Sequence, residues 1–143
     1  MRHRLAPALL LALAACGGTD SPGSGDGGRT VSVTADDRLR FTPATVDAKA
    51  GERVTFRVTN SGSIKHEFVI GDAEYHESHK AAAATPGADH GGHAGGGDGE
   101  SVDVGPGETK TVTFTMPGSA PAFACYVDRH DQAGMSGRVS YGS

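Results

Sequence analysis

The pattern of apolar and polar positions changes twice along this chain. Arg2 and Arg4 precede an unbroken apolar run from residue 5 to residue 15. This run is too short to cross a bilayer as a permanent helix, and its layout predicts a secretory signal peptide over residues 1–15. Residues 16–29 are mostly Gly, Ser, Thr, Asp and Pro, with almost no apolar side chain to bury, so we expect a flexible tether there.

From residue 30 to residue 143 the apolar positions recur with the period of two that is typical of β-strands. Clusters of Gly, Pro, Asn and Ser separate these stretches and indicate turns. The pattern predicts one small all-β domain, a Greek-key β-sandwich of about eight strands, and leaves no room for a second domain. The expected strands cover residues 31–35, 39–41, 45–48, 54–59, 64–70, 111–115, 123–127 and 137–141.

Residues 72–100 break the strand pattern with a segment rich in Ala, Gly and His. We expect a mobile insert, because this composition offers little apolar surface for a core. His76 and His79 form one His-x2-His pair, and His90 and His93 form another, a spacing that places both rings of a pair on one side of a helical turn. Two interpretations stay open: a weak, exchangeable second metal site, or a solvated loop whose histidines bind nothing.

The end of the apolar run predicts how the protein is held outside the cytoplasm. Leu13, Ala14, Ala15 and Cys16 resemble a bacterial lipobox, in which the cysteine receives diacylglycerol and becomes the first mature residue. The alternative is an ordinary signal peptide cut near Ala15. Both alternatives predict export, and the first predicts a lipid anchor at Cys16 that faces the periplasm or the cell exterior.

Charge argues against nucleic acid as a partner. Removing Arg2 and Arg4 leaves 11 basic and 17 acidic residues, a net charge of −6 with histidine neutral. The chain also has no stripe of Lys and Arg that would neutralise phosphates. We therefore expect no nucleic-acid binding.

Cys125 is an unusual residue for an exported protein, because a lipidated Cys16 would leave it without a disulfide partner. It could be an inert buried thiol, but its neighbours favour a metal ligand. His130 and Met135 follow it as C-x4-H-x4-M, and His66 opens an apolar strand earlier in the chain. Two imidazoles, a thiolate and a weak axial thioether suit copper in electron-transfer sites, whereas zinc prefers a fourth thiolate, imidazole, carboxylate or water.

This arrangement resembles the cupredoxins, a family that includes plastocyanin, azurin and exported proteins associated with copper tolerance. The resemblance implies one type 1 copper, with His66, Cys125 and His130 as equatorial ligands and Met135 as the axial ligand. One position departs from the family pattern, because Glu67 stands where many cupredoxins have Asn. The stretches that carry the resemblance beyond the ligands are residues 66–72, 106–109, 123–125 and 133–135.

The expected site leaves no open position for substrate or activated water, so we do not expect an enzyme. The leading hypothesis is a membrane-tethered, monomeric carrier of single electrons between redox protein partners. The alternative is extracytoplasmic sequestration or delivery of copper in copper tolerance, a role that the His-rich segment and the family resemblance favour.

Overall fold

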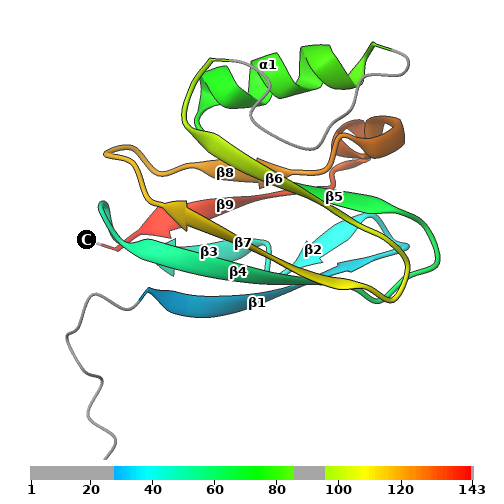
Figure 1. Cartoon of the computed structure of the whole chain (residues 1–143), viewed down its shortest axis with the longest axis horizontal. Coiled ribbons are helices and arrows are strands. Elements are labelled where there is room, and N and C mark those ends of the chain that lie inside the picture. The colour runs from blue at the N-terminus through cyan, green and yellow to red at the C-terminus, as the bar shows by residue number, and fades with distance from the viewer. Residues whose placement is uncertain (1–27, 86–95, 143) are drawn as a thin grey trace, which may run out of the picture.

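The computed structural model describes residues 28–85 and 96–142, which form two β-sheets, one α-helix and a 3-10 turn (Figure 1). One sheet has the strand order β2-β1-β4-β7, and the other has the order β3-β9-β8-β5-β6. The elements are β1 (Arg29–Asp36), β2 (Arg40–Thr42), β3 (Thr45–Ala48), β4 (Arg53–Asn60), β5 (His66–Gly71), α1 (Ala73–Ala83), β6 (Gly99–Val104), β7 (Thr109–Thr115), β8 (Ala122–Ala124), η1 (Val127–Ala133) and β9 (Ser136–Tyr141).

The core lies between the two sheets, as the alternating pattern predicts. In β4 the buried side chains of Val54, Phe56 and Val58 alternate with exposed or half-buried ones. Phe68 of β5 lies near the centre of the core, with its ring centroid 5.3 Å from those of Phe56 and Phe123. Because side chains of both sheets meet here, the predicted all-β sandwich is confirmed.

The eight expected strands all correspond to strands of the structure, although several differ in extent and the described part of the chain has one strand more. β8 ends at Ala124, whereas the sequence pattern extended this strand to Val127. The described residues contain a ninth strand, β6, which lies at the sheet edge and pairs antiparallel with β5. The side chains of β6 are mostly polar and half-buried, which explains why its apolar pattern is weak.

The expectation of a mobile insert was wrong for the first part of residues 72–100. Residues 73–83 form α1, whose N-terminus is capped by Asp72 through a 2.8 Å hydrogen bond from the Tyr75 backbone N–H to its carboxylate. Residues 86–95, which include His90 and His93, lie outside the described residues. Within the described part of the chain, no helix has the length and apolar character needed to cross a bilayer.

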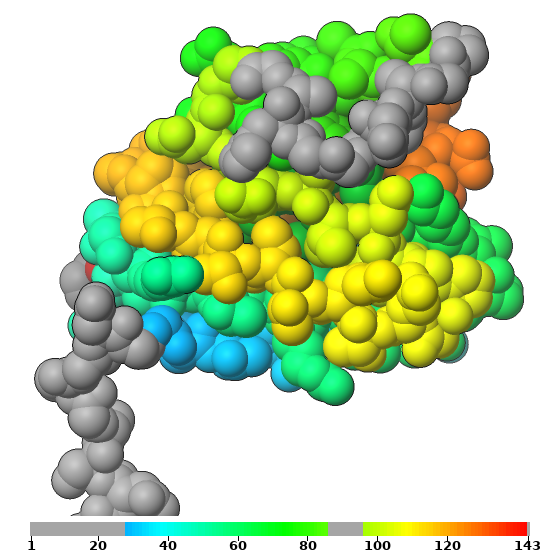
Figure 2. All heavy atoms as spheres, viewed as in Figure 1, coloured from blue at the N-terminus to red at the C-terminus, as the bar shows by residue number. Residues whose placement is uncertain are grey.

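Helix α1 covers the outer face of β5, and for this reason all six residues of β5 are buried. Figures 1 and 2 show the helix lying above the strands of this sheet, close to η1. The ring of Tyr75 packs on Gly71 and Gly99, which are paired across β5 and β6. A Cβ atom on Gly99 would lie 2.1 Å from this ring, so a side chain there would displace the helix.

Candidate metal centre

Three of the four predicted ligands meet at one end of the sandwich. The ligand atoms of His66, Cys125 and His130 all lie within 4.8 Å of one another, and the three side chains are buried. The Cys125 Sγ is 3.5 Å from the His130 Nδ1. Within residues 28–85 and 96–142 this is the single group of three or more His, Cys, Asp or Glu side chains with metal-binding spacing.

The C-terminal segment positions Cys125, His130 and Met135 together. Cys125 directly follows β8, and η1 then carries His130 back toward the sulfur. Gly134 takes a left-handed conformation with φ of 92°, which ends the 3-10 turn before Met135. Met135 is fully buried; its N–H donates to the His130 carbonyl at 3.0 Å, and its carbonyl accepts from the Cys125 N–H at 3.1 Å. The loop is therefore closed by backbone hydrogen bonds between the three ligand residues.

The loop before β5 holds His66 in place from the other side. The carboxylate of Asp37 accepts hydrogen bonds from the Ser63 backbone N–H at 2.8 and 2.9 Å and from the Ile64 N–H at 3.2 Å. The hydrogen bonds from Ser63 lower the pKa of the Asp37 carboxyl group. The Asn60 side chain also donates to the Ile64 carbonyl at 2.7 Å. These contacts fix the approach to His66 before any metal binds.

The buried donors fit a copper ion. Both ring nitrogens of His66 are removed from water, and within the described residues neither makes a hydrogen bond of ordinary geometry. Such buried polar atoms are unfavourable unless something binds them, and a metal bond would satisfy one. Burial, with a smaller contribution from His130, lowers the pKa of His66, which keeps its imidazole in the neutral form that coordinates metals.

Cys125 is held as a thiol in the metal-free protein, because burial raises its pKa to about 11. Metal binding must therefore displace this proton to generate the thiolate ligand. His66, Cys125 and His130 would hold the ion, with the thioether of the buried Met135 as a further donor from the same loop. With that set, copper supplies a one-electron couple between its cuprous and cupric states.

A second group of polar side chains surrounds the ligands and was not recognised in the sequence. The Glu67 backbone N–H donates to Cys125 Sγ at 3.4 Å, while its carboxylate accepts from His79 Nε2 at 2.8 Å. His76 Nε2 lies 3.0 Å from the Ala122 carbonyl, and its Nδ1 lies 2.8 Å from the Tyr126 hydroxyl. Because a carbonyl only accepts, Nε2–H donates to it, and the neutral ring accepts the Tyr126 proton at Nδ1.

The structure describes two of the four histidines of the candidate second metal site, His76 and His79. His76 and His79 lie on the buried face of α1, and His76 uses both ring nitrogens in hydrogen bonds within the protein. Neither residue belongs to a metal-binding group among the described residues. His90 and His93 lie outside the described residues, so a site formed by them stays a prediction.

The buried position of His76 predicts a pH-dependent stability. Burial lowers the pKa of His76, with a smaller contribution from His79. Below about pH 6.5 the unfolded chain binds a proton that the folded protein resists, so stability falls as the pH decreases, by at most about 1.4 kcal/mol per pH unit.

Urea unfolding of the metal-free protein at pH 7.5 and 5.5 measures this dependence. His76→Gln is expected to lose less stability over this range than the unchanged chain, while His66 contributes equally in both proteins. Equal losses in the two proteins would show that His76 does not titrate in this way.

The fold and the donor set together define a class of protein. A sandwich of two sheets, with two buried imidazoles, a thiol and a thioether at one end, has the architecture of a cupredoxin. Residues 29–142 match the family described as copper binding proteins of the plastocyanin/azurin family, and the chain belongs to this family.

Curated relatives at the sequence level have names that refer to copper resistance. The chain is 38% identical over 114 residues to the copper-resistant cuproprotein CopI of Rubrivivax gelatinosus, and the match covers 78% of this chain and 65% of that relative. It is 32% identical over 137 residues to the copper-resistant cuproprotein CopI of Pseudomonas aeruginosa, with 78% and 75% covered. The chain thus spans just under two thirds of the length of the first of these relatives.

Solved structures show the same fold at lower identity. Reduced auracyanin from Roseiflexus castenholzii is 19% identical with a TM-score of 0.66, and the match covers 83% of this chain and 100% of that chain. Auracyanin A, a "blue" copper protein from Chloroflexus aurantiacus, is 24% identical with a TM-score of 0.63, and the match covers 80% and 100%.

Proposed function

We propose that this protein is a type 1 copper protein that carries single electrons outside the cytoplasm. The observation that carries the proposal is the closed group of buried donors, His66, Cys125 and His130, with Met135 at the same end of the sandwich. Four protein donors satisfy the ion and leave no position for a substrate or an activated water. This favours electron transfer over catalysis, so we propose no enzymatic reaction.

The exposure of the ligands favours one route for the electron. His130 is 9% exposed, whereas His66 and Cys125 are fully buried. The ring edge of His130 is therefore the point at which a redox protein partner would approach the copper most closely.

We also propose that the protein is exported and acts as a monomer held to the membrane by lipid alone. The signal segment and the lipobox-like residues around Cys16 support export and the lipid anchor, and they lie outside the described residues. Metabolic labelling with a radioactive fatty acid tests it: the unchanged chain should incorporate the label, and Cys16→Ala should not. Equal labelling of the two chains would contradict the lipid anchor.

Voltammetry of the full-length, copper-loaded protein tests the electron carrier. We expect a reversible one-electron couple that persists over repeated cycles, because the same four donors can hold both oxidation states. Copper that leaves the protein on reduction would contradict the carrier and favour delivery of copper. A metal analysis after each cycle distinguishes the two outcomes.

Copper tolerance is the second candidate function, and the names of the two CopI relatives favour it. A copper-sensitive bacterial host that expresses the chain should grow at higher copper, and Cys125→Ser should remove this effect. The double variant His90→Gln, His93→Gln tests whether residues outside the main site contribute to copper tolerance, and it leaves the sequence of α1 unchanged. If the double variant gives lower tolerance but keeps the same reduction couple, sequestration is favoured. If the original chain itself gives no gain in tolerance, this role is excluded in that host.

A further inference from the structure

Helix α1 carries His79, whose hydrogen-bond partner Glu67 contacts the sulfur of Cys125. His79 lies on the buried face of the helix and donates from Nε2 to the Glu67 carboxylate at 2.8 Å. We propose that His79 is a positioning residue of the copper centre, which fixes Glu67 and thereby sets the reduction potential of the metal. The proposal rests on the type 1 copper function proposed above and assigns a role to a helix that the ligand set does not use.

Glu67 connects the helix to the sulfur ligand because its two ends make different contacts. Its backbone N–H donates to Cys125 Sγ at 3.4 Å. Its side chain lies on the face of β5 that α1 covers, where it contacts His79. Glu67 is 3% exposed and His79 is 1% exposed, so both groups of this pair are removed from water. Losing either partner would leave the other buried without its main interaction, which is strongly unfavourable. The pair therefore restricts where Glu67 can lie.

The helix that carries His79 is itself held at several independent points. His76 donates to the Ala122 carbonyl and accepts from Tyr126, the residue that follows the sulfur ligand. Near its start, Tyr75 packs on two glycines of the sheet. Near its end, Lys80 lies 3.8 Å from the Asp131 carboxylate of η1, a partly exposed pair that contributes little energy. A side chain on so fixed an element can hold its partner in a narrow geometry, as groups around metal ligands commonly do.

The expected effect on the reduction potential has a definite sign. The cuprous site carries one positive charge fewer than the cupric site, so a donor to the sulfur favours the reduced state and raises the potential. A carboxylate near the metal acts in the opposite direction, because it favours the more positive state. Glu67 supplies both the N–H donor and the carboxylate. His79 holds the N–H in place, and its hydrogen bond to the carboxylate partly offsets the negative charge there.

Three substitutions, measured in the full-length copper-loaded protein by voltammetry and visible absorption, separate these effects. His79→Leu should lower the potential, because Glu67 loses its partner and the N–H to sulfur contact is loosened. His79→Gln should stay close to the unchanged protein, since its amide can still donate to Glu67. Glu67→Gln should raise the potential, because it keeps both hydrogen bonds and removes the charge.

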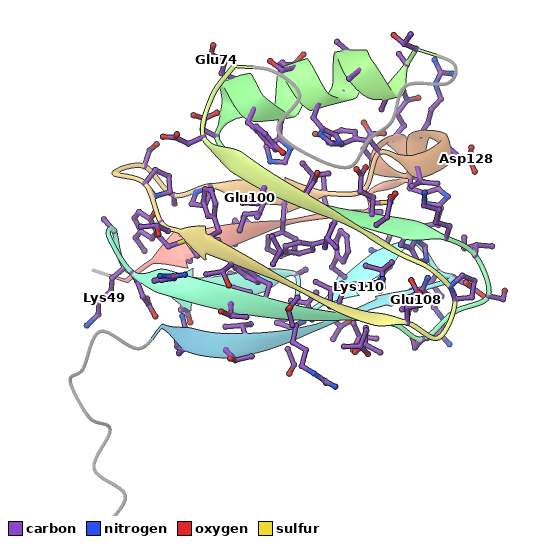
Figure 3. The ribbon with its side chains drawn as sticks, viewed as in Figure 1. Lys49, Glu74, Glu100, Glu108, Lys110 and Asp128 are labelled. Atoms are coloured by element: carbon purple, nitrogen blue, oxygen red, sulfur yellow. The ribbon has the colours of Figure 1, made fainter. Side chains whose placement is uncertain are left out.

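Glu74→Gln is the matched control, because it removes a carboxylate from the same helix. Glu74 is exposed and lies at the end of α1 remote from η1 and Asp128 (Figure 3). If His79→Leu and Glu74→Gln have the same reduction potential, the proposal is overturned. If His79→Leu does not fold, the other two variants decide: a Glu67→Gln potential that does not rise, or a His79→Gln potential that departs from the unchanged protein, overturns it.

Amide hydrogen exchange in the metal-free protein gives a readout that does not depend on copper. His79→Leu should accelerate exchange at the Glu67 N–H by about tenfold while the Val69 N–H of the same strand changes little. Equal acceleration at both amides would mean that His79 only stabilises the fold, and would contradict the positioning role. If the unchanged protein forms no type 1 copper site, the proposed function fails, while the exchange result still reports on His79.

Discussion

Replacement of Cys125 by serine is expected to abolish the visible absorption of the copper-loaded protein. This absorption arises from charge transfer between the thiolate and copper, and Cys125 is the one cysteine among the described residues. A serine hydroxyl is not deprotonated near neutral pH and lacks the polarisable sulfur, so the band should disappear rather than weaken. Absorption spectra of both proteins after loading with one equivalent of cupric ion provide the measurement.

Two controls show whether the loss of colour reports on the ligand itself. Cys16→Ser changes the other cysteine of the chain and should leave the full band. The metal-free Cys125→Ser protein should remain folded, with a stability loss of about 1–2 kcal/mol, because the hydroxyl oxygen can still accept the Glu67 N–H. Colour that persists in Cys125→Ser would refute the assignment of the sulfur ligand.

The residues of the candidate metal site could be picked out because their chemistry is rare and their order is informative. A lone thiol in an exported protein, followed at short intervals by an imidazole and a thioether, leaves few structural explanations. Cys125, His130 and Met135 also lie in one loop, so no long-range pairing had to be known. His66 was harder, and it was found because it opens an apolar strand that had to lie in the core.

Helix α1 could not be recognised from apolar periodicity, because its buried face contains Tyr75, His76 and His79 rather than aliphatic side chains. The burial of the two histidines depends on partners far away in the sequence, such as Tyr126. A local signal was nevertheless present: Asp72 can cap a helix, and the residues that follow it to Ala83 include no Gly or Pro. Strand β6 likewise depends on its pairing with β5.

The role of Glu67 shows the same limit at the scale of one side chain. Its departure from the Asn of many cupredoxins was visible in the sequence, but nothing local indicated which residue would balance a buried carboxylate. His79 lies twelve residues later, on the element that the sequence did not predict. Because α1 was not predicted, the partner of Glu67 and the other contacts around the Cys125 sulfur could not be predicted either.

Phe68→Ala is expected to lower the free energy of unfolding by about 3–5 kcal/mol, a large part of the roughly 5–15 kcal/mol of a typical domain. Phe68 is fully buried, and its ring contacts those of Phe41, Phe56 and Phe123. Removing the ring leaves a cavity between strands of both sheets, which cannot collapse without moving the sandwich.

Urea unfolding of the metal-free protein measures this loss, and Ile64→Ala is the control. Ile64 is 39% exposed, so its truncation should change stability by no more than about 0.5 kcal/mol. Under conditions where Phe68→Ala is folded, it should keep the charge-transfer band, because no ligand has changed. The two variants then fail in opposite ways: Cys125→Ser keeps the fold and loses the colour, and Phe68→Ala keeps the colour and loses stability. A loss below about 1 kcal/mol in Phe68→Ala would contradict the central position of this ring in the core.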